Sequence, residues 1–291
     1  MVSPVVVGVD GSAESLAAAE WAAREAARRG RALRLLHARS WHPGQDRPQA
    51  VPAGERHRAR RVLRAAAARV RAACPGVPLD GRQVAGPAPA ALVGAAGEAD
   101  LLVLGSRGLG RLSSLVVGSV ALGVVAQATR PVVLVRAGTA GQAADAAGTG
   151  RRGVVVGVDV TEPCDAVLAF AFEAARLRHA RLRVLHAWRA PDRLTLGPGE
   201  VGLAGAPQRA EEWLGFLSAV LRVWREKYPE VEVLPTVVEG RPAGALLEAA
   251  SGADLLVVGD RLTGRRGMPR TGPVTHAVIH RVGCPVAIVP H

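Results

Sequence analysis

The chain has 291 residues, which is too long for one average domain and suits two domains of common size. Its hydrophobic fraction of 49% and aromatic fraction of 3% suit thin, alanine-rich helices packed on a buried sheet. The net charge of +12 attracts polyanions in general without indicating which one.

No apolar run reaches the ~20 residues that a helix needs to cross a bilayer. The first residues also lack the basic start and the cleavage site of a signal peptide. We therefore expect a cytoplasmic protein without a membrane partner. Cys74, Cys164 and Cys284 are far apart and have no metal-binding spacing, so we expect free thiols in a reducing compartment.

Short apolar runs alternate with helical patterns from the first residues onward. The runs lack polar alternation, which is typical of strands covered on both faces in a parallel sheet. We expect strands at residues 5–9, 33–38, 79–84, 101–105 and 132–135, with 79–84 the least apolar. The first helix should begin after Ser12 and end at Gly30. Apolar residues at helical spacing predict a second helix over residues 58–73.

The same pattern returns in the second half of the chain. Residues 5–10, Val-Val-Val-Gly-Val-Asp, return at 154–159, which is an offset of 149 residues. Residues 131–135 return in similar form at 285–289, an offset of 154 residues, so one short insertion separates the two matches. We infer a tandem duplication.

The alternation of strands and helices predicts an α/β fold of two tandem, doubly wound, Rossmann-like domains, each with a five-stranded parallel sheet. We place the domains at residues 1–137 and 152–291, joined by a small, flexible linker at 138–151. In the second domain Thr161 precedes the first helix, and Pro163 suits a position in its first turn.

A glycine-rich segment follows the strand expected at residues 101–105. It reads Gly105-Ser106-Arg107-Gly108-Leu109-Gly110-Arg111, and then Gly118-Ser119 at the start of the next helix. Ligands of doubly wound sheets bind beyond the carboxyl ends of the strands, where the strand order reverses. Glycines let backbone N–H groups approach an anion and adopt positive φ, and a helix N-terminus favours negative charge. We therefore predict a phosphate cradle; the competing interpretation is a loop that only turns the chain.

Neither common phosphate-binding motif is present. No Gly-Lys-[Ser/Thr] follows, as a Walker A loop requires, and the first strand–helix turn lacks the dinucleotide fingerprint. Asp10, at the end of the first strand, either contacts a ligand or caps the first helix. His37 and His186 are interpreted as tolerated residues at strand ends, because no acid or nucleophile partner is evident.

These residues resemble the signature of the universal stress protein family in its tandem form. That family has an Asp at the end of the first strand and the pattern Gly-x2-Gly-x9-Gly-[Ser/Thr]. Gly105, Gly108, Gly118 and Ser119 match the pattern without a gap. The resemblance covers both copies and implies an adenine-nucleotide alpha hydrolase-like fold that binds ATP, with Mg²⁺ as a common companion. No residue identifies the metal ligands.

The resemblance also implies roles for residues of the first copy. Asp10 and the backbone of Val9 would meet the ribose and adenine, Ala38 would contact adenine through its main chain, and Leu104 would line the pocket. The ribose and phosphates would be held by Gly105, Gly108, Gly118, Ser119 and Val120, with Arg107 and Arg111 as additional phosphate contacts.

The second copy departs from the pattern. Leu262 replaces the second glycine, Pro273 replaces the serine and removes an N–H donor, and Asp260 adds a negative charge. Asp159 is retained, so adenosine would still have a partner there. Phosphate affinity should be much weaker, and Arg261, Arg265 and Arg266 restore it only in part. We predict a degenerate nucleotide site in the second domain.

Three functions remain open at this stage. The first is an ATP-binding stress-response regulator with an unknown protein partner. The second is a superfamily enzyme with slow ATPase or nucleotidyl-transfer activity, although no catalytic constellation is evident. The third is a basic protein associated with nucleic acid. It depends on an arginine-rich helix that lacks interleaved aromatics, for which a solvated helix face is the preferred interpretation.

The last strand of each copy is apolar, and the two can pair edge to edge, as in dimers of the family. Such pairing would make the tandem chain an internal pseudo-dimer. A homodimer through the same strands is the alternative.

Overall fold

The structure, a computed structural model, describes residues 3–39, 53–106, 117–138, 153–189, 206–261 and 271–291. Within these ranges, no helix combines the length and the apolar character that a membrane crossing needs. The elements of the first copy are β1 (Val5–Gly8), α1 (Ala13–Arg29), β2 (Leu33–Arg39), α2 (Ala53–Ala73), β3 (Leu79–Ala85), α3 (Ala88–Gly97), β4 (Leu101–Ser106), α4 (Ser119–Val125) and β5 (Val132–Arg136).

The second copy repeats this alternation. Its elements are β6 (Val154–Gly157), α6 (Asp165–Arg178), β7 (Leu182–Trp188), α7 (Ala206–Lys227), β8 (Val233–Glu239), α8 (Pro242–Ala249), β9 (Leu255–Asp260), α9 (Pro273–Arg281) and β10 (Val286–Pro290). The strands expected in the first copy are therefore confirmed, and so is the alternating α/β order.

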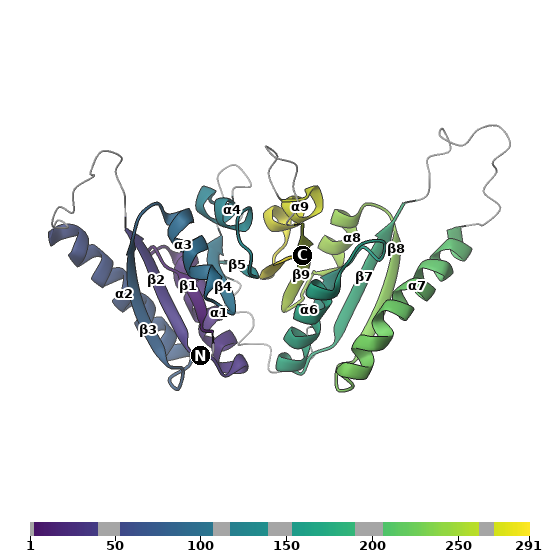
Figure 1. Cartoon of the computed structure of the whole chain (residues 1–291), viewed down its shortest axis with the longest axis horizontal. Coiled ribbons are helices and arrows are strands. Elements are labelled where there is room, and N and C mark those ends of the chain that lie inside the picture. Colours follow the sequence, from purple (N-terminus) through teal and green to yellow (C-terminus); the bar gives the residue numbers. More distant parts are fainter. Residues whose placement is uncertain (1–2, 40–52, 107–116, 139–152, 190–205, 262–270) are drawn as a thin grey trace.

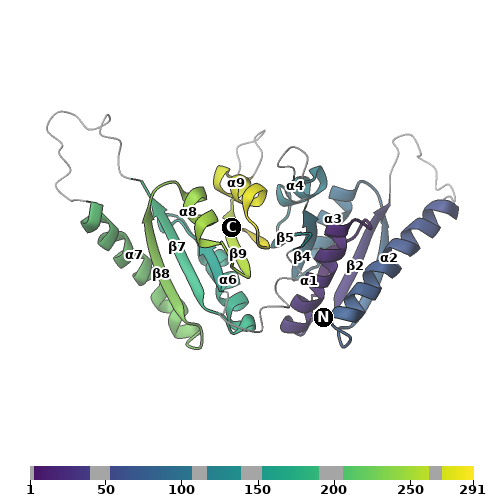
Figure 2. The ribbon, with the colours of Figure 1, turned by 180° about the vertical axis from the view of Figure 1, so that it is seen from behind.

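The strands form one ten-stranded sheet in the order β3-β2-β1-β4-β5-β10-β9-β6-β7-β8. Within each copy all neighbours are parallel, as predicted. The copies meet where β5 and β10 pair antiparallel, with Val133 opposite Ala287. The expected internal pairing of the last strands is confirmed. Figures 1 and 2 show the two copies as the arms of a V that meet at this pair.

Helices cover both faces of the sheet, and the core accordingly has two layers. Val5 and Val7 point to the face covered by α1, α2, α6 and α7, whereas Val6 points to the face covered by α3, α4, α8 and α9. This alternation of side chains along a strand explains why the strands are apolar throughout: both of their faces are buried. Each layer continues across β5 and β10 into the other copy.

The ends of α1 agree with the sequence-based expectation. The Ser12 hydroxyl accepts the N–H of Ser15, at 3.2 Å, and Gly30 closes the helix with a left-handed φ of 60°.

The expected start of the matching helix in the second copy is wrong, because α6 begins at Asp165, after Pro163. Thr161 gives both its N–H and its hydroxyl to the carboxylate of Asp159, so the chain forms a local turn there before the helix begins.

Candidate functional site

The strand order locates the expected ligand site of the first copy at the carboxyl ends of β1 and β4. β1 has β2 on one side and β4 on the other. The chain moves outward from β1 to β2 and β3, and then crosses over to β4, so the order reverses between β1 and β4. Such a switch point leaves a crevice at the carboxyl ends of the strands. Residues 9–10 follow β1 at this edge, Gly105 lies near the end of β4, and α4 begins nearby at Ser119.

Asp10 is held in place by the first turn of α1. Its Oδ1 accepts the backbone N–H of Ser12 at 2.9 Å and the Ser12 hydroxyl at 2.6 Å. Partial burial raises the pKa of this carboxyl, but the hydrogen bonds from Ser12 outweigh burial and leave the pKa below its usual value. Asp10 is thus a charged acceptor at the switch point. It does not cap α1 itself, because Ser12 does so.

The turn between β1 and α1 depends on a residue that sequence reasoning missed. Gly11 has a φ of +89°, and a Cβ there would lie 3.1 Å from Cγ2 of Val62. Only glycine adopts this conformation readily. The run Asp10-Gly11-Ser12 could have predicted this turn, because that composition is typical of tight turns.

The two histidines have a structural role that the sequence interpretation did not include. Nδ1 of His37 lies 2.7 Å from the carbonyl oxygen of Val9, and Nδ1 of His186 lies 3.2 Å from that of Val158. A carbonyl only accepts, so each imidazole donates through Nδ1. The N–H of Val9 in turn reaches the carbonyl of Leu36 at 2.8 Å. Both backbone groups of Val9 therefore have partners within the chain, and a ligand would use the second lone pair of its carbonyl.

Gly105 is required by packing. A Cβ at this position would lie 2.6 Å from the carbonyl carbon of Glu14 and 2.7 Å from the backbone nitrogen of Ser15. The absence of a side chain therefore allows the first turn of α1 to lie directly against β4. The expectation of positive φ does not hold for Gly105 or Gly118: Gly118 has a φ of −56°, and Gly105 is absent from the positive-φ residues.

The start of α4 matches the prediction, with Gly118 as the residue before the helix and Ser119 as its first residue. Ser119 and Val120 are exposed there. The first N–H groups of a helix have no partner inside the helix, so they are available to an anion. Arg107, Gly108 and Arg111 lie outside the described residues.

Two other predicted contacts lie on the adjoining strands. Ala38 is half-buried near the end of β2, opposite Val84 of β3. Leu104 is buried in the core layer formed with α3 and α4, and its Cδ2 would lie 2.8 Å from a Cβ at Gly8. Leu104 therefore acts first as a core residue. In the described part of the chain, no group of three His, Cys, Asp or Glu residues is placed to hold a metal ion.

The second copy contains a pocket of about 500 Å³ at the equivalent edge. Its wall includes Asp159 after β6, Asp260 at the end of β9, and the first residues of α9 from Pro273. Its apolar lining includes Val158, Leu185, Leu246 and Val258. A volume of this size suits a small molecule.

The carboxylate of Asp260 lies at the beginning of α9. Asp260 is 7% exposed, and its Oδ1 accepts the N–H of Gly272, the residue before the helix, at 3.3 Å. The Thr275 hydroxyl donates to the carbonyl of Gly259 at 2.9 Å and ties the first turn of α9 to β9. Arg261 lies 3.0 Å from Glu162. Leu262, Arg265 and Arg266 lie outside the described residues.

The chain is similar to known proteins over nearly its whole length. The sequence profile of the universal stress protein family matches residues 1–136 and 150–290. A universal stress protein of Mycobacterium bovis is 33% identical over 298 residues, covering 98% of this chain and 96% of its own length. One of Mycolicibacterium smegmatis is 31% identical over 298 residues, with the same two shares.

Among solved structures, a universal stress protein from Archaeoglobus fulgidus has a TM-score of 0.73 at 20% identity. The match covers 100% of this chain and 99% of the other. At this identity, the likeness concerns the fold alone.

Proposed function

This chain belongs to the universal stress protein family, as two tandem copies of its domain, and from this premise we propose that the first copy binds ATP and that the bound nucleotide makes the protein a stress-response regulator. The observation that carries the proposal is the arrangement at the switch point between β1 and β4. There a charged carboxylate, Asp10, and the N-terminus of α4 lie at the same edge of the sheet.

The two ends of this site suit the two ends of a nucleotide. Asp10 is a hydrogen-bond acceptor, so it suits the hydroxyl groups of a ribose. The N–H groups at Ser119 and Val120 suit phosphate oxygens, because backbone donors and the helix dipole both favour negative charge there. Main-chain groups of Val9 and Ala38 would face the adenine, and Leu104 would contribute an apolar wall.

The remaining phosphate contacts are assigned to the glycine-rich loop. We propose that Gly105, Gly108 and Gly118 leave room for the phosphates and that Arg107 neutralises part of their charge. Mg²⁺, where it accompanies ATP, would take most of its ligands from phosphate oxygens and water, as is usual for this ion.

We propose that the second copy, residues 152–291, does not bind ATP. Asp260 and Pro273 replace a serine each at the phosphate end of the site, which adds a charge and removes a donor. One chain should therefore hold one ATP. Residues 138–151 would act as the linker between the two domains.

We further propose that the protein acts in the cytoplasm on a protein partner that responds to the nucleotide state. β5 and β10 already pair with each other, so a homodimer through these strands would require this pair to open. We therefore infer that any association of two chains uses another surface.

The test begins with the protein as purified. Heat denaturation should release an adenine nucleotide, identified by chromatography and mass spectrometry, at about one per chain. The stripped, refolded protein should then bind ATP at one site in calorimetry. Absence of both the released nucleotide and the heat of binding would overturn the proposal.

A further inference from the structure

We propose that α7 carries a self-complementary surface through which two copies of this chain associate, with the two α7 helices antiparallel. The surface, which we call the α7 ridge, consists of Glu212, Phe216, Val220, Val223 and Lys227 on one side of the helix. The inference goes beyond the proposed function, because it concerns a partner surface and does not depend on nucleotide binding.

The ridge exposes large apolar side chains on a helix that is already packed on the core. Phe216 is 62% exposed and Val223 is 65% exposed. They are seven residues apart with the half-buried Val220 between them, so the three side chains share one side of the helix. Another side of α7 faces the core through Leu217 and Leu221, which are fully buried. α7 therefore has apolar residues both toward the core and toward solvent.

The matching helix of the first copy lacks this feature. α2 and α7 lie at the outer ends of the two arms in Figures 1 and 2. In the described chain, none of the exposed large apolar residues belongs to α2, whose exposed positions include Arg58, Arg61 and Ala65. The fold therefore does not require apolar residues on this side of the helix, and those of α7 indicate a partner.

Two members of the ridge are held in place by neighbouring rings. The ring centroid of Phe216 lies 5.9 Å from that of Trp213, which lies 4.9 Å from that of the buried His186. Nζ of Lys227 lies 5.3 Å from the ring centroid of Trp224. These contacts restrict the side chains before a partner arrives, so less entropy is lost on association.

The charges of the ridge identify the partner. Glu212 lies one turn before Phe216, Lys227 lies one turn after Val223, and both charged residues are exposed. Consider two α7 helices that are antiparallel about a two-fold axis between residues 219 and 220. Glu212 then faces the partner's Lys227, and Phe216 faces the partner's Val223, because the members of each pair are equally far from the axis. A parallel pair in register would place like charges side by side, which is repulsive. The pattern therefore favours a second copy of this chain in antiparallel orientation.

The neighbouring strand edge is poorly suited to the same purpose. The backbone groups of Glu232 and Gly240 bond to β7, so the odd-numbered residues between them direct their backbone groups to the outer edge of β8. Pro235 has no N–H to offer there, and the carbonyl of Val233 accepts Arg225 at 3.4 Å. Addition of a strand from another chain is therefore disfavoured, and the helix is the better surface.

The association is tested by sedimentation velocity on the full chain, with and without ATP. The chain has a mass of 30.1 kDa, so dimer formation doubles the sedimenting mass. We expect a reversible dimer that forms between about 1 and 100 µM, in keeping with a small interface. A chain that stays monomeric over this range in both conditions would overturn the inference.

The apolar part of the ridge is tested by single substitutions. Phe216→Ser and Val223→Ser should each weaken the dimer about tenfold or more, because each removes a central apolar contact. Leu234→Ser is the matched control, since Leu234 is an exposed apolar residue of β8 outside the ridge, and it should leave the dissociation constant unchanged. Circular dichroism confirms that each variant is folded. A dimer that Phe216→Ser leaves intact would show that the chains associate elsewhere.

The charged part is tested by exchange of the two charges. Glu212→Lys and Lys227→Glu should each weaken the dimer about fivefold, because each places like charges opposite one another at both ends of a two-fold pair. The variant with both changes restores opposite charges and should regain most of the original affinity. Failure of the double variant to recover would contradict the antiparallel arrangement.

A cross-link reports the arrangement directly. Lys227 is the only lysine of the chain, and a carbodiimide joins its amine to a neighbouring carboxylate. Within one helix Glu212 and Lys227 are about 22 Å apart, because each residue adds about 1.5 Å, so a bond between them must join two chains. Mass spectrometry of the digested dimer should identify this bond, and its absence would exclude the proposed register.

The inference and the proposed function can fail separately. Calorimetry should give Phe216→Ser the same ATP affinity as the original chain, because the ridge is remote from the switch point of the first copy. A monomer that binds ATP would overturn this inference alone. A dimer that binds no ATP would remove the proposed function alone.

Discussion

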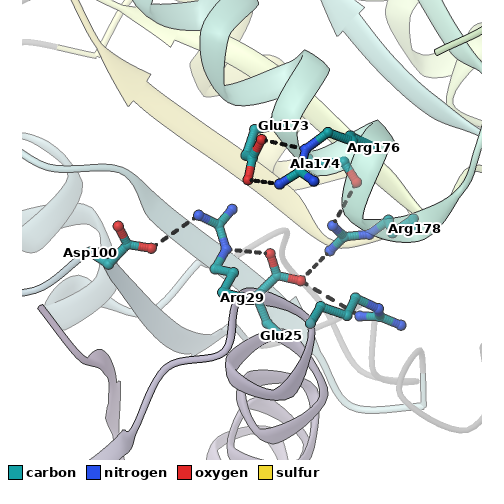
Figure 3. A network of polar contacts seen from close by, with 8 residues as sticks. Glu25, Arg29, Asp100, Glu173, Ala174, Arg176 and Arg178 are labelled. Carbon is teal, nitrogen blue, oxygen red and sulfur yellow. Dashed lines mark hydrogen bonds and ion pairs between the residues drawn. The ribbon is translucent and has the colours of Figure 1, made fainter. Parts of the chain in front are cut away.

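The carboxylate of Glu25 in α1 lies 2.6 Å from the guanidinium of Arg178 in α6, across the boundary between the two copies. The other oxygen of Glu25 accepts Arg29 at 2.7 Å, and Arg29 also reaches Asp100 at 3.0 Å (Figure 3). Glu25 is 0% exposed. Burial alone would raise the pKa of its carboxyl, but Arg178 and Arg29 together lower it below the ordinary value.

The surrounding contacts are reciprocal. Arg29 lies over the ring of Phe170, 5.2 Å from its centroid, and Arg178 lies over Trp21 at 5.8 Å. Each arginine of one copy thus packs on the aromatic residue of the other. Glu25 has no counterpart, because the aligned residue is Ala174. One carboxylate therefore neutralises an arginine from each copy.

Replacing this carboxylate should destabilise the junction strongly. We expect Glu25→Gln to lower the free energy of unfolding by about 3–5 kcal/mol, because it removes the carboxylate that pairs with the buried Arg178 and leaves Arg29 with Asp100 alone. Urea unfolding followed by circular dichroism measures the change. The matched control is Glu173→Gln, whose ion pair with Arg176 lies nearer the surface, with side chains 33% and 40% exposed. It should leave the unfolding midpoint close to that of the original chain. Equal midpoints for all three proteins would contradict this role.

The same carboxylate should make stability depend on acid. The pKa of Glu25 is lower in the folded chain than its ordinary value. Its contribution is therefore fully present above about pH 4.5 and is lost as the pH falls through the lower, folded value. The urea midpoint of the original chain should fall in this acidic range. Glu25→Gln should show a shallower fall, and an identical slope in both proteins would exclude Glu25 as a source.

Gly105→Ala should damage the fold as well as the site. The new Cβ would lie 2.6–2.7 Å from backbone atoms of Glu14 and Ser15, which cannot rotate away as a side chain can. We expect a loss of about 1–3 kcal/mol in unfolding free energy, together with weaker ATP binding as α1 shifts. Gly118→Ala is the control for stability, because a Cβ there meets nothing within 4 Å.

Gly108→Glu should abolish ATP binding, because it would place a side chain and a negative charge in the proposed phosphate loop. Leu262→Glu, at the aligned position of the second copy, should leave the stoichiometry near one ATP per chain. Calorimetry on both variants measures the ATP affinity and the number of ATP molecules bound per chain, and circular dichroism confirms that each variant is folded. An unchanged ATP affinity in the first variant would remove the loop from the proposed site.

The thiols should differ in reactivity. Burial raises the pKa of Cys284 to about 11, and burial followed by Asp165 and Asp159 also raises that of Cys164. The reactive form is the thiolate, and Cys74 is the more accessible residue. Iodoacetamide at mildly alkaline pH should therefore modify Cys74 first in the folded protein. In denaturant all three should react, and early modification of Cys284 in the native chain would contradict its burial.

Several features could be predicted from sequence because they are local. The limits of α1 follow from Ser12 and Gly30, and the start of α4 follows from Gly118 and Ser119. The start of α6 could not be predicted correctly, because the Thr161 hydroxyl donates a hydrogen bond to the carboxylate of Asp159 and does not cap the helix. That choice between two uses of one hydroxyl depends on how the strand end positions Asp159.

The repeated pattern of apolar strands and helices determined by itself that the protein is two doubly wound copies of one domain, because burial of both sheet faces imposes that pattern on the residues. The pairing of β5 with β10 was already expected from the sequence. Only the tertiary structure decided that Glu25 balances arginines of both copies and that Asp260 lies at the start of α9. These relationships join residues far apart in the chain. Hydrogen bonds and ion pairs act over a few ångströms, so they exist only after folding has brought their partners together.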